Sequence, residues 1–152
     1  MSSINRRMGA PAFLCTLAVL VAGCGGNGTG PDEIERSDVV GGYEATTFET
    51  TDDGQTTDQL AEGAELTVTL NSDGTTAGNL FVPGGAEDGG DLDASLAGTW
   101  TFDANSNAVE FVQSADTFVR DMTFTATREG ESVQLEGEES FGGPTITVVL
   151  EQ

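Results

Sequence analysis

Glu65-Leu66-Thr67-Val68-Thr69-Leu70 decides the fold, because polar and apolar residues alternate strictly through it. Side chains on a β-strand point to opposite faces in turn, so a period of two indicates one buried and one solvated face. The same alternation returns at 98–102, 122–128, 132–136 and 145–150. The sequence therefore predicts an all-β domain built from half-buried strands.

Short runs rich in Asn, Asp and Gly separate the alternating segments, as in Asn71-Ser72-Asp73-Gly74. Such residues suit tight turns, so successive strands are expected to pair as an antiparallel meander. The expected strands are 42–50, 65–71, 75–82, 97–103, 107–113, 118–128, 131–138 and 144–151. About eight strands would close into a small barrel without exposed edges, and a two-sheet β-sandwich is the alternative. Residues 58–65 fit one helical turn, and 83–95 reads as a long loop.

Apolar residues of these runs form the expected interior. They are Leu66, Val68, Leu70, Leu80, Trp100, Phe102, Val109, Phe111, Met122, Phe124, Val133, Leu135, Ile146, Val148 and Leu150. An eight-stranded barrel encloses a space just wide enough for side chains or one small ligand. This set is large enough to fill such a space, which favours a packed interior. Trp100 is expected to pack in the core.

The first 24 residues have the organisation of an export signal. Arg6-Arg7 precedes an uncharged run from Ala12 to Ala22, which at eleven residues is too short to cross a bilayer. The run ends at Val21-Ala22-Gly23-Cys24, which resembles the lipobox of bacterial lipoprotein precursors. The resemblance implies that residues 1–23 are a cleaved signal peptide and that lipid on Cys24 anchors the chain in a membrane.

Two other export signals remain open on the sequence alone. An ordinary signal peptide also has small residues before its cleavage site, and Arg6-Arg7 occurs in twin-arginine signals. Residues 24–37, which include a Gly-rich run, are expected to be a flexible tether before a folded domain at 38–152. The lipoprotein resemblance implies the bacterial cell envelope, and Gly25 after the lipidated cysteine favours the outer membrane over the inner.

The chain is strongly acidic, with 26 Asp and Glu residues and a formal net charge of −21 at pH 7. Nucleic-acid binding requires a basic surface, so this class of partner is excluded. The acidic residues are scattered over many segments. This distribution favours a bulk adaptation to a salty habitat over a specific cation-attracting surface.

Catalytic groups are scarce. The chain has no histidine, Cys15 is expected to leave with the signal peptide, and Cys24 is expected to carry lipid. Ser-His-Asp and Cys-His arrangements are therefore not available, and carboxylate pairs carry no information in so acidic a chain. We expect no enzyme, no catalytic residue and no cofactor.

Two loops contain oxygen donors of the kind that calcium prefers. Asp103-Ala104-Asn105-Ser106-Asn107 alternates such donors, and Asp88-Gly89-Gly90-Asp91-Leu92-Asp93 groups three carboxylates. The first lacks the glycine and the distant glutamate of a calcium loop, and the second has the wrong spacing. Both are predicted to be polar turns, and no metal ligand is assigned.

A second resemblance concerns the rest of the chain. Gly42-Tyr43-Glu44-Ala45-Thr46, then Leu66 to Gly74, Gly98-Thr99-Trp100 and Ala108 to Gln113 follow one another in an order similar to that of small lipocalin-like domains of bacterial lipoproteins. The resemblance implies a lipocalin-like barrel. In true lipocalins the Gly-x-Trp motif lies on the first strand, whereas here it falls on a middle strand.

These observations lead to two functional hypotheses. The first is a non-catalytic structural or interaction module, anchored to the membrane, whose partner is an envelope protein. The alternative is a carrier that binds a small apolar ligand inside the barrel. The first requires a packed interior and the second requires a vacant one.

Overall fold

The computed structural model describes residues 33–140 and 142–152, which form one antiparallel sheet of ten strands with one short helix. The strands are β1 (Gly41–Asp52), β2 (Gln55–Asp58), β3 (Glu65–Leu70), β4 (Thr75–Val82), β5 (Leu92–Ser95), β6 (Gly98–Asp103), β7 (Ala108–Gln113), β8 (Thr123–Glu129), β9 (Ser132–Ser140) and β10 (Thr145–Glu151). Helix α1 (Phe118–Asp121) lies between β7 and β8. In this described part of the chain, no helix is long and apolar enough to cross a membrane.

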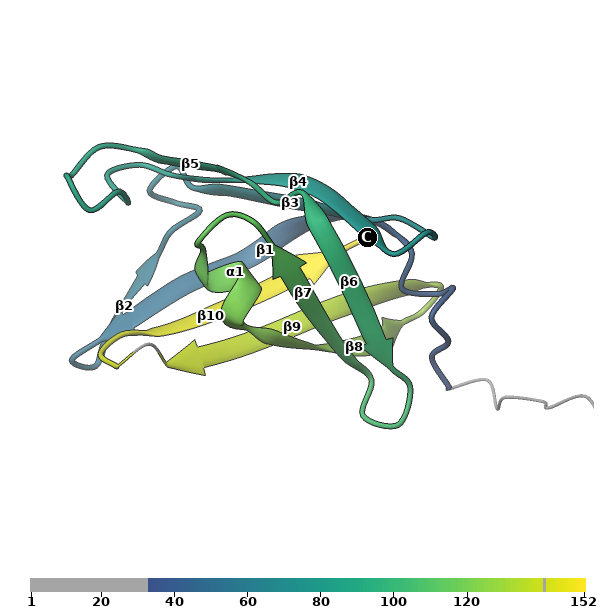
Figure 1. The fold of residues 1–152 in the computed structure, drawn as a ribbon. Coiled ribbons are helices and arrows are strands. Elements are labelled where there is room, and N and C mark those ends of the chain that lie inside the picture. The colour runs from purple at the N-terminus through teal and green to yellow at the C-terminus, as the bar shows by residue number, and fades with distance from the viewer. Residues whose placement is uncertain (1–32, 141) are drawn as a thin grey trace, which may run out of the picture.

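Eight strands close into a barrel (Figure 1). Their order around the barrel is β1-β3-β4-β6-β7-β8-β9-β10, and β10 returns to pair with β1. This last pairing runs from Glu44 opposite Glu151 to Thr51 opposite Thr145, with a β-bulge between Ala45 and Thr47. The prediction of a closed, lipocalin-like antiparallel barrel is confirmed, and the two-sheet alternative is excluded.

Strands β2 and β5 lie outside this closure, at one end of the barrel. β2 pairs with the last four residues of β1. β3 pairs with the first four residues of β1, on the same side of that strand. β5 pairs with residues 79–82 of β4, on the side where β6 pairs with residues 75–76. We call this end, on the left of Figure 1, the mouth. The opposite end, at which the chain enters from residue 33, is the floor.

Local sequence explains two of the tight connections. Asp53 and Gly54, with φ of 48° and 78°, join β1 to β2. Positive φ at both central residues gives the hairpin turn whose twist matches that of the strands. On β4, Gly78 has a φ of 141°, and a Cβ there would lie 2.1 Å from the carbonyl oxygen of Thr67. Only glycine fits where these two strands approach so closely.

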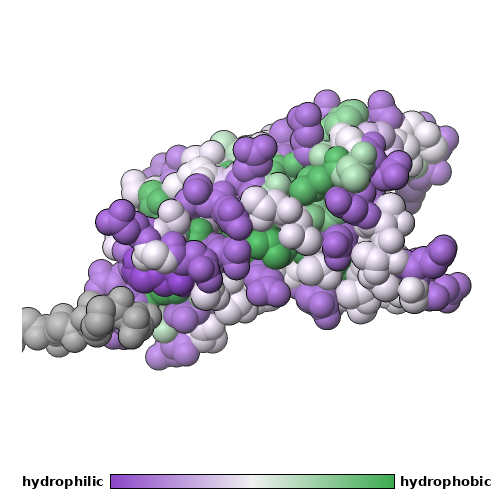
Figure 2. Space-filling view, turned by 180° about the vertical axis from the view of Figure 1, so that it is seen from behind, coloured by the Kyte–Doolittle hydropathy of each residue, from purple (hydrophilic) through white to green (hydrophobic). Residues whose placement is uncertain are grey.

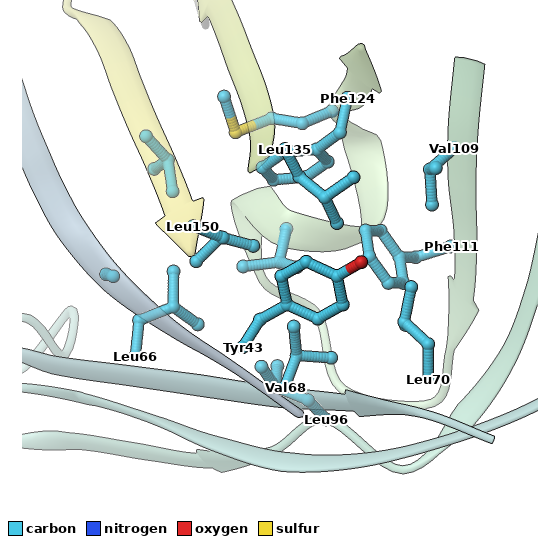
Figure 3. Close-up of a cluster of buried hydrophobic side chains, with 14 of the residues drawn as sticks. Tyr43, Leu66, Val68, Leu70, Leu96, Val109, Phe111, Phe124, Leu135 and Leu150 are labelled. Atoms are coloured by element: carbon cyan, nitrogen blue, oxygen red, sulfur yellow. The ribbon is translucent and has the colours of Figure 1, made fainter. Parts of the chain in front are cut away.

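Inward side chains of the eight strands fill the barrel. Figure 3 shows residues from facing strands meeting in its centre, among them Leu66 and Val68 on one side and Phe124 and Leu135 on the other. These four side chains are at most 1% exposed, and 22 apolar residues of the described chain are buried in one cluster. All fifteen residues of the expected interior are buried or, for Phe102 and Ile146, partly buried against that cluster.

Two local expectations were wrong, and both concern the mouth. Residues 118–121, expected to begin a strand, form α1 instead. The expected loop 83–95 ends in β5, which gains its strand conformation by pairing with β4. Between β2 and β3 the chain makes a single helical-type turn, in which the Glu62 N–H donates to the Asp58 carbonyl oxygen.

Candidate functional site

The segment before β1 crosses the floor of the barrel and closes it. Ile34 and Val39 are buried there. The indole N–H of Trp100 donates to the carbonyl oxygen of Asn71 at 2.9 Å, and the Arg36 guanidinium lies 4.3 Å above the centre of the indole ring. A cation in this position is attracted by the negative face of the ring. Trp100 thus packs in the core and holds the floor, and Ile34 is buried although it falls in the range expected to be tether.

A second set of hydrogen bonds joins the floor to the barrel wall. The Tyr43 hydroxyl donates to the carbonyl oxygen of Val39 at 2.8 Å. The side-chain amide of Gln152 donates to the Tyr43 hydroxyl at 3.0 Å and to the Asp38 carbonyl at 3.2 Å, while its oxygen accepts from the Val133 N–H. Burial raises the pKa of Tyr43, so its hydroxyl keeps its proton and remains a donor at neutral pH.

An ion pair completes the floor. The Arg128 guanidinium lies 2.7 Å from an Asp38 carboxylate oxygen, and each side chain is about one third exposed or less. The backbone N–H of Glu35 also donates to this carboxylate. That hydrogen bond first, and Arg128 after it, lower the pKa of Asp38. No sequence pattern singles out Asp38 and Arg128, since their contact joins positions 90 residues apart.

The mouth is built differently, because the barrel wall is incomplete there. β7 and β8 pair at three positions, the last of which joins Glu110 to Thr123. Beyond that pair the strands separate and α1 lies between them (Figure 1). The Phe118 ring packs against Phe48 with centroids 5.2 Å apart, and Val119 is fully buried. Helix α1 therefore plugs the barrel at the mouth.

Polar atoms beside this plug lack partners. Gln113 and Thr117 are each 6% exposed. The Gln113 amide donates to the Leu96 carbonyl at 3.3 Å, but among the described residues its oxygen and the Thr117 hydroxyl have no hydrogen-bond partner. Buried polar groups without partners cost roughly 1–3 kcal/mol each. Thr117 also makes no capping hydrogen bond to α1. The floor has one such atom too, since Arg128 Nε is buried without a hydrogen-bond partner among the described residues.

Partly buried apolar residues gather at the mouth. Seven such residues pack against the core, and five of them lie toward this end: Leu60, Val82, Leu92, Phe118 and Ile146. From behind, Figure 2 shows hydrophilic residues around the outline of the molecule and hydrophobic residues through the middle of that face. More of the partly buried apolar residues therefore lie toward the mouth than toward the floor.

Acidic residues surround this apolar surface. Asp52 ends β1, Asp53 lies on the β1–β2 turn, and Glu87 and Asp88 lie on the loop before β5; all four are exposed. Arg120 on α1 forms ion pairs with neighbouring carboxylates. A partner that suits the mouth therefore carries apolar groups flanked by positive charge.

The two loops considered for calcium use their carboxylates to shape turns. Asp103 accepts hydrogen bonds from the backbone N–H and the side-chain amide of Asn105, and these bonds lower its pKa. Asp88 accepts from the N–H of Gly90, and Asp91 accepts from the N–H of Gly84. Within residues 33–140 and 142–152, no group of three or more His, Cys, Asp or Glu is placed to hold a metal ion.

The surface of the described residues has hollows that are open to solvent, at the ends of the barrel and along its wall. One lies at the mouth between the loop before β5 and Asp116, and its other lining residues include Glu87, Asp88 and Leu92. It is a shallow acidic depression beside the plug.

The expected lipidation site, Cys24, lies outside the described residues. Comparison with models of protein families finds no match, and comparisons with curated proteins and with solved structures find none either.

Proposed function

We propose that the chain is a lipoprotein of the bacterial cell envelope, anchored through lipid on Cys24, with the outer membrane favoured over the inner. Its barrel is a non-catalytic structural or interaction module. The proposal of a non-catalytic module rests on the filled interior, in which 22 buried apolar residues form one cluster. A barrel packed to ordinary protein density has no room for a ligand unless side chains move.

The position of the floor supports this proposal. Residue 33 lies at the floor and follows Cys24 by nine residues, which span at most about 30 Å when fully extended. An anchored chain would keep the floor within this distance of the membrane. The mouth, with its apolar residues and exposed carboxylates, would then be directed away from the lipid surface toward a partner in the envelope.

The anchor is tested by substituting each cysteine in turn. In cells fed an alkyne-tagged fatty acid, Cys24→Ser is expected to abolish labelling and to leave the signal peptide uncleaved. Cys15→Ser is the matched control, because it removes the other cysteine of the chain, and it should be labelled and processed like the wild type. Labelling that persists in Cys24→Ser would contradict the proposed anchor.

The module is tested against the carrier alternative by native mass spectrometry. The chain from residue 24, carrying Cys24→Ser, is incubated with an envelope lipid extract and compared with a sample kept without lipid. A packed barrel is expected to show the same mass in both. A small molecule retained at one-to-one stoichiometry would overturn the module and support the carrier.

A further inference from the structure

Four strands continue past the end of the barrel wall at the mouth and form a sheet of their own (Figure 1). β8 pairs with β9 only as far as Glu136, opposite Thr125, and residues 137–140 of β9 pair with β10 alone among the described strands. β1 pairs with β2 in place of β3 over its last four residues. We call this sheet the shelf. It consists of residues 138–140 of β9, 145–147 of β10, 49–52 of β1 and 55–58 of β2.

The register of the shelf places four side chains in one row across the face that continues the barrel interior. Ile146 lies opposite Glu139 on one side and opposite Thr50 on the other, and Thr50 in turn lies opposite Thr57. Side chains alternate between the faces of a strand, so Glu139 shares the inward face with buried Gly137, two residues before it. Ile146 and Thr50 are partly exposed, and Glu139 and Thr57 are exposed. The inward face of the shelf is therefore accessible to a partner.

Apolar packing ends at this row. Phe48, two residues before Thr50 on the same face, is 3% exposed and contacts Phe118 of α1, with ring centroids 5.2 Å apart. Phe118 and Ile146 are only partly buried against the core. An apolar side chain placed on Ile146 would leave water and cover that residue as well, and burial of apolar surface is favourable. The centre of the row therefore suits an apolar group.

Carboxylates lie on both sides of Ile146. Glu139 is on β9 and Asp52 is on β1, two residues beyond Thr50, and β10 lies between these two strands. Neither carboxylate forms an ion pair within residues 33–140 and 142–152. The arginines of this part of the chain contact other groups: Arg36 lies over Trp100, Arg120 pairs with Asp116 and Asp121, and Arg128 pairs with Asp38. Complementary charge at the shelf is therefore left for a partner to supply.

We infer that the shelf binds an extended segment of another envelope protein, in which a large apolar residue has lysine or arginine two positions before it and two positions after it. The inference deepens the proposed function and rests on it, since it states the chemistry of the partner of the module. The shelf lies at the mouth, at the opposite end of the barrel from residue 33, so an anchored chain presents it away from the membrane.

The spacing of the shelf matches such a segment. The backbone at Glu139 is one strand away from Ile146, or about 5 Å. Asp52 is one strand away on the other side and two residues along, or about 8 Å. In an extended segment, the residues two positions from a central one point the same way as it does, about 7 Å from it. Both carboxylates can therefore be reached while the apolar side chain lies on Ile146.

A contact of this size is weak, because exposed ion pairs contribute little. NMR titration suits it, since shifts of backbone amides locate the binding site and also measure the affinity. The chain from residue 24, labelled with nitrogen-15 and carrying Cys24→Ser, contains every described strand. It is titrated with the blocked peptide Thr-Lys-Thr-Leu-Thr-Lys-Thr. We expect saturable shifts at Thr50, Thr57, Glu139 and Ile146.

Two further peptides test the chemistry of the partner. Replacing both lysines by serine, or the leucine by serine, is expected to weaken binding at least roughly threefold in each case. Equal binding of the peptide without lysine would overturn the inference in favour of an uncharged occupant. Equal binding of the peptide without leucine would also overturn it, because attraction to the acidic surface would then be sufficient.

Paired variants separate the shelf from the acidity of the whole chain. Glu139→Gln is expected to weaken binding roughly threefold. Glu136→Gln is the matched control, because it removes the same charge from the same strand on the outer face, and it should bind as the wild type does. Ile146→Ala is compared in the same way with Val112→Ala, since Val112 is an exposed apolar residue on β7. Equal weakening in Glu139→Gln and Glu136→Gln, or shifts spread over strands outside the shelf, would overturn the inference.

Lipid labelling of the full chain in cells separates this inference from the proposed anchor. If Cys24 is labelled but the peptide causes no saturable shift at the shelf, the shelf is overturned and the anchor stands. If the peptide binds at the shelf but Cys24 is not labelled, the shelf is supported and the anchor is contradicted.

Discussion

The floor and the mouth of the barrel are closed by different means. At the floor, side chains donate to defined acceptors, as Trp100 does to Asn71 and Tyr43 does to Val39. At the mouth, closure depends on a one-turn helix whose Phe118 packs against Phe48, while buried oxygens nearby lack partners. Hydrogen bonds of fixed geometry hold one arrangement, whereas apolar contacts tolerate several. The contrast predicts that the floor contributes more to the stability of the fold than the mouth does.

Removing the central side chain of the floor should have the largest effect. Trp100→Ala deletes a side chain that is 2% exposed, together with its hydrogen bond and its contact with Arg36. We expect a loss of about 3–5 kcal/mol in the free energy of unfolding. Urea denaturation followed by circular dichroism measures it, since the variant lacks the one tryptophan of the chain.

Thr101→Ala is the control on the same strand, because Thr101 is exposed, and it should change stability little. A loss below about 1 kcal/mol in Trp100→Ala would contradict the role given to the floor.

Truncating the plug should have a smaller and more local effect. Phe118→Ala removes a partly buried ring and its contact with Phe48, at an expected cost of about 2 kcal/mol. Hydrogen exchange should accelerate in residues 111–122 and leave the floor protected, because local opening of the plug does not require the barrel to unfold.

Phe102→Ala is the comparison variant, since Phe102 is also partly buried but lies on β6 toward the floor. Exchange that accelerates equally at both ends in Phe118→Ala would show that floor and mouth open together.

Gln152→Ala probes the hydrogen bonds that tie the floor to the wall. The substitution leaves the Val133 N–H and the Tyr43 hydroxyl without this partner, so we expect a loss of about 1–2 kcal/mol. Thermal unfolding measures the change. The neighbouring exposed residue supplies the control: Glu151→Ala should be close to neutral or slightly stabilising, because it removes a carboxylate opposite Glu44.

The sequence predicted the wall of the barrel better than its two ends. Alternation over Glu65–Leu70 located β3 and its buried face, because a strand with one wet side leaves this pattern. The sequence of β2 shows no such alternation, since Gln55–Asp58 is exposed throughout and is a strand only by pairing with β1. The spacing of Val119 and Met122, both buried and three residues apart, was the available signal for α1.

The candidate site was beyond prediction for a similar reason. The partly buried residues of the mouth come from five separate segments, and which of them are exposed depends on where β7 and β8 stop pairing. Neighbours on the outer wall likewise depend on register: Thr99 lies beside Val112 only because β6 and β7 pair with Gly98 opposite Gln113. Composition alone indicated a uniformly acidic surface.

The smallest expected effect is on the pH dependence of stability, through the ion pair between Asp38 and Arg128 at the floor. The pKa of Asp38 is lowered in the folded state, so its contribution to stability is present above the unfolded value of about 3.8 and is lost as pH falls through the folded value. Acid also neutralises the other carboxylates, which relieves repulsion and acts in the opposite direction. The pH profile of the wild type alone therefore cannot isolate the contribution of Asp38.

The difference in unfolding free energy between wild type and Asp38→Asn should shrink from pH 5 to pH 2. Asp103→Asn is the reference variant, because Asp103 is away from any arginine contact and its carboxylate is held only by hydrogen bonds within its turn. A constant difference for Asp38→Asn across this range would show that Arg128 and the Glu35 N–H do not favour the charged carboxylate, and the floor would then be held by its neutral hydrogen bonds alone.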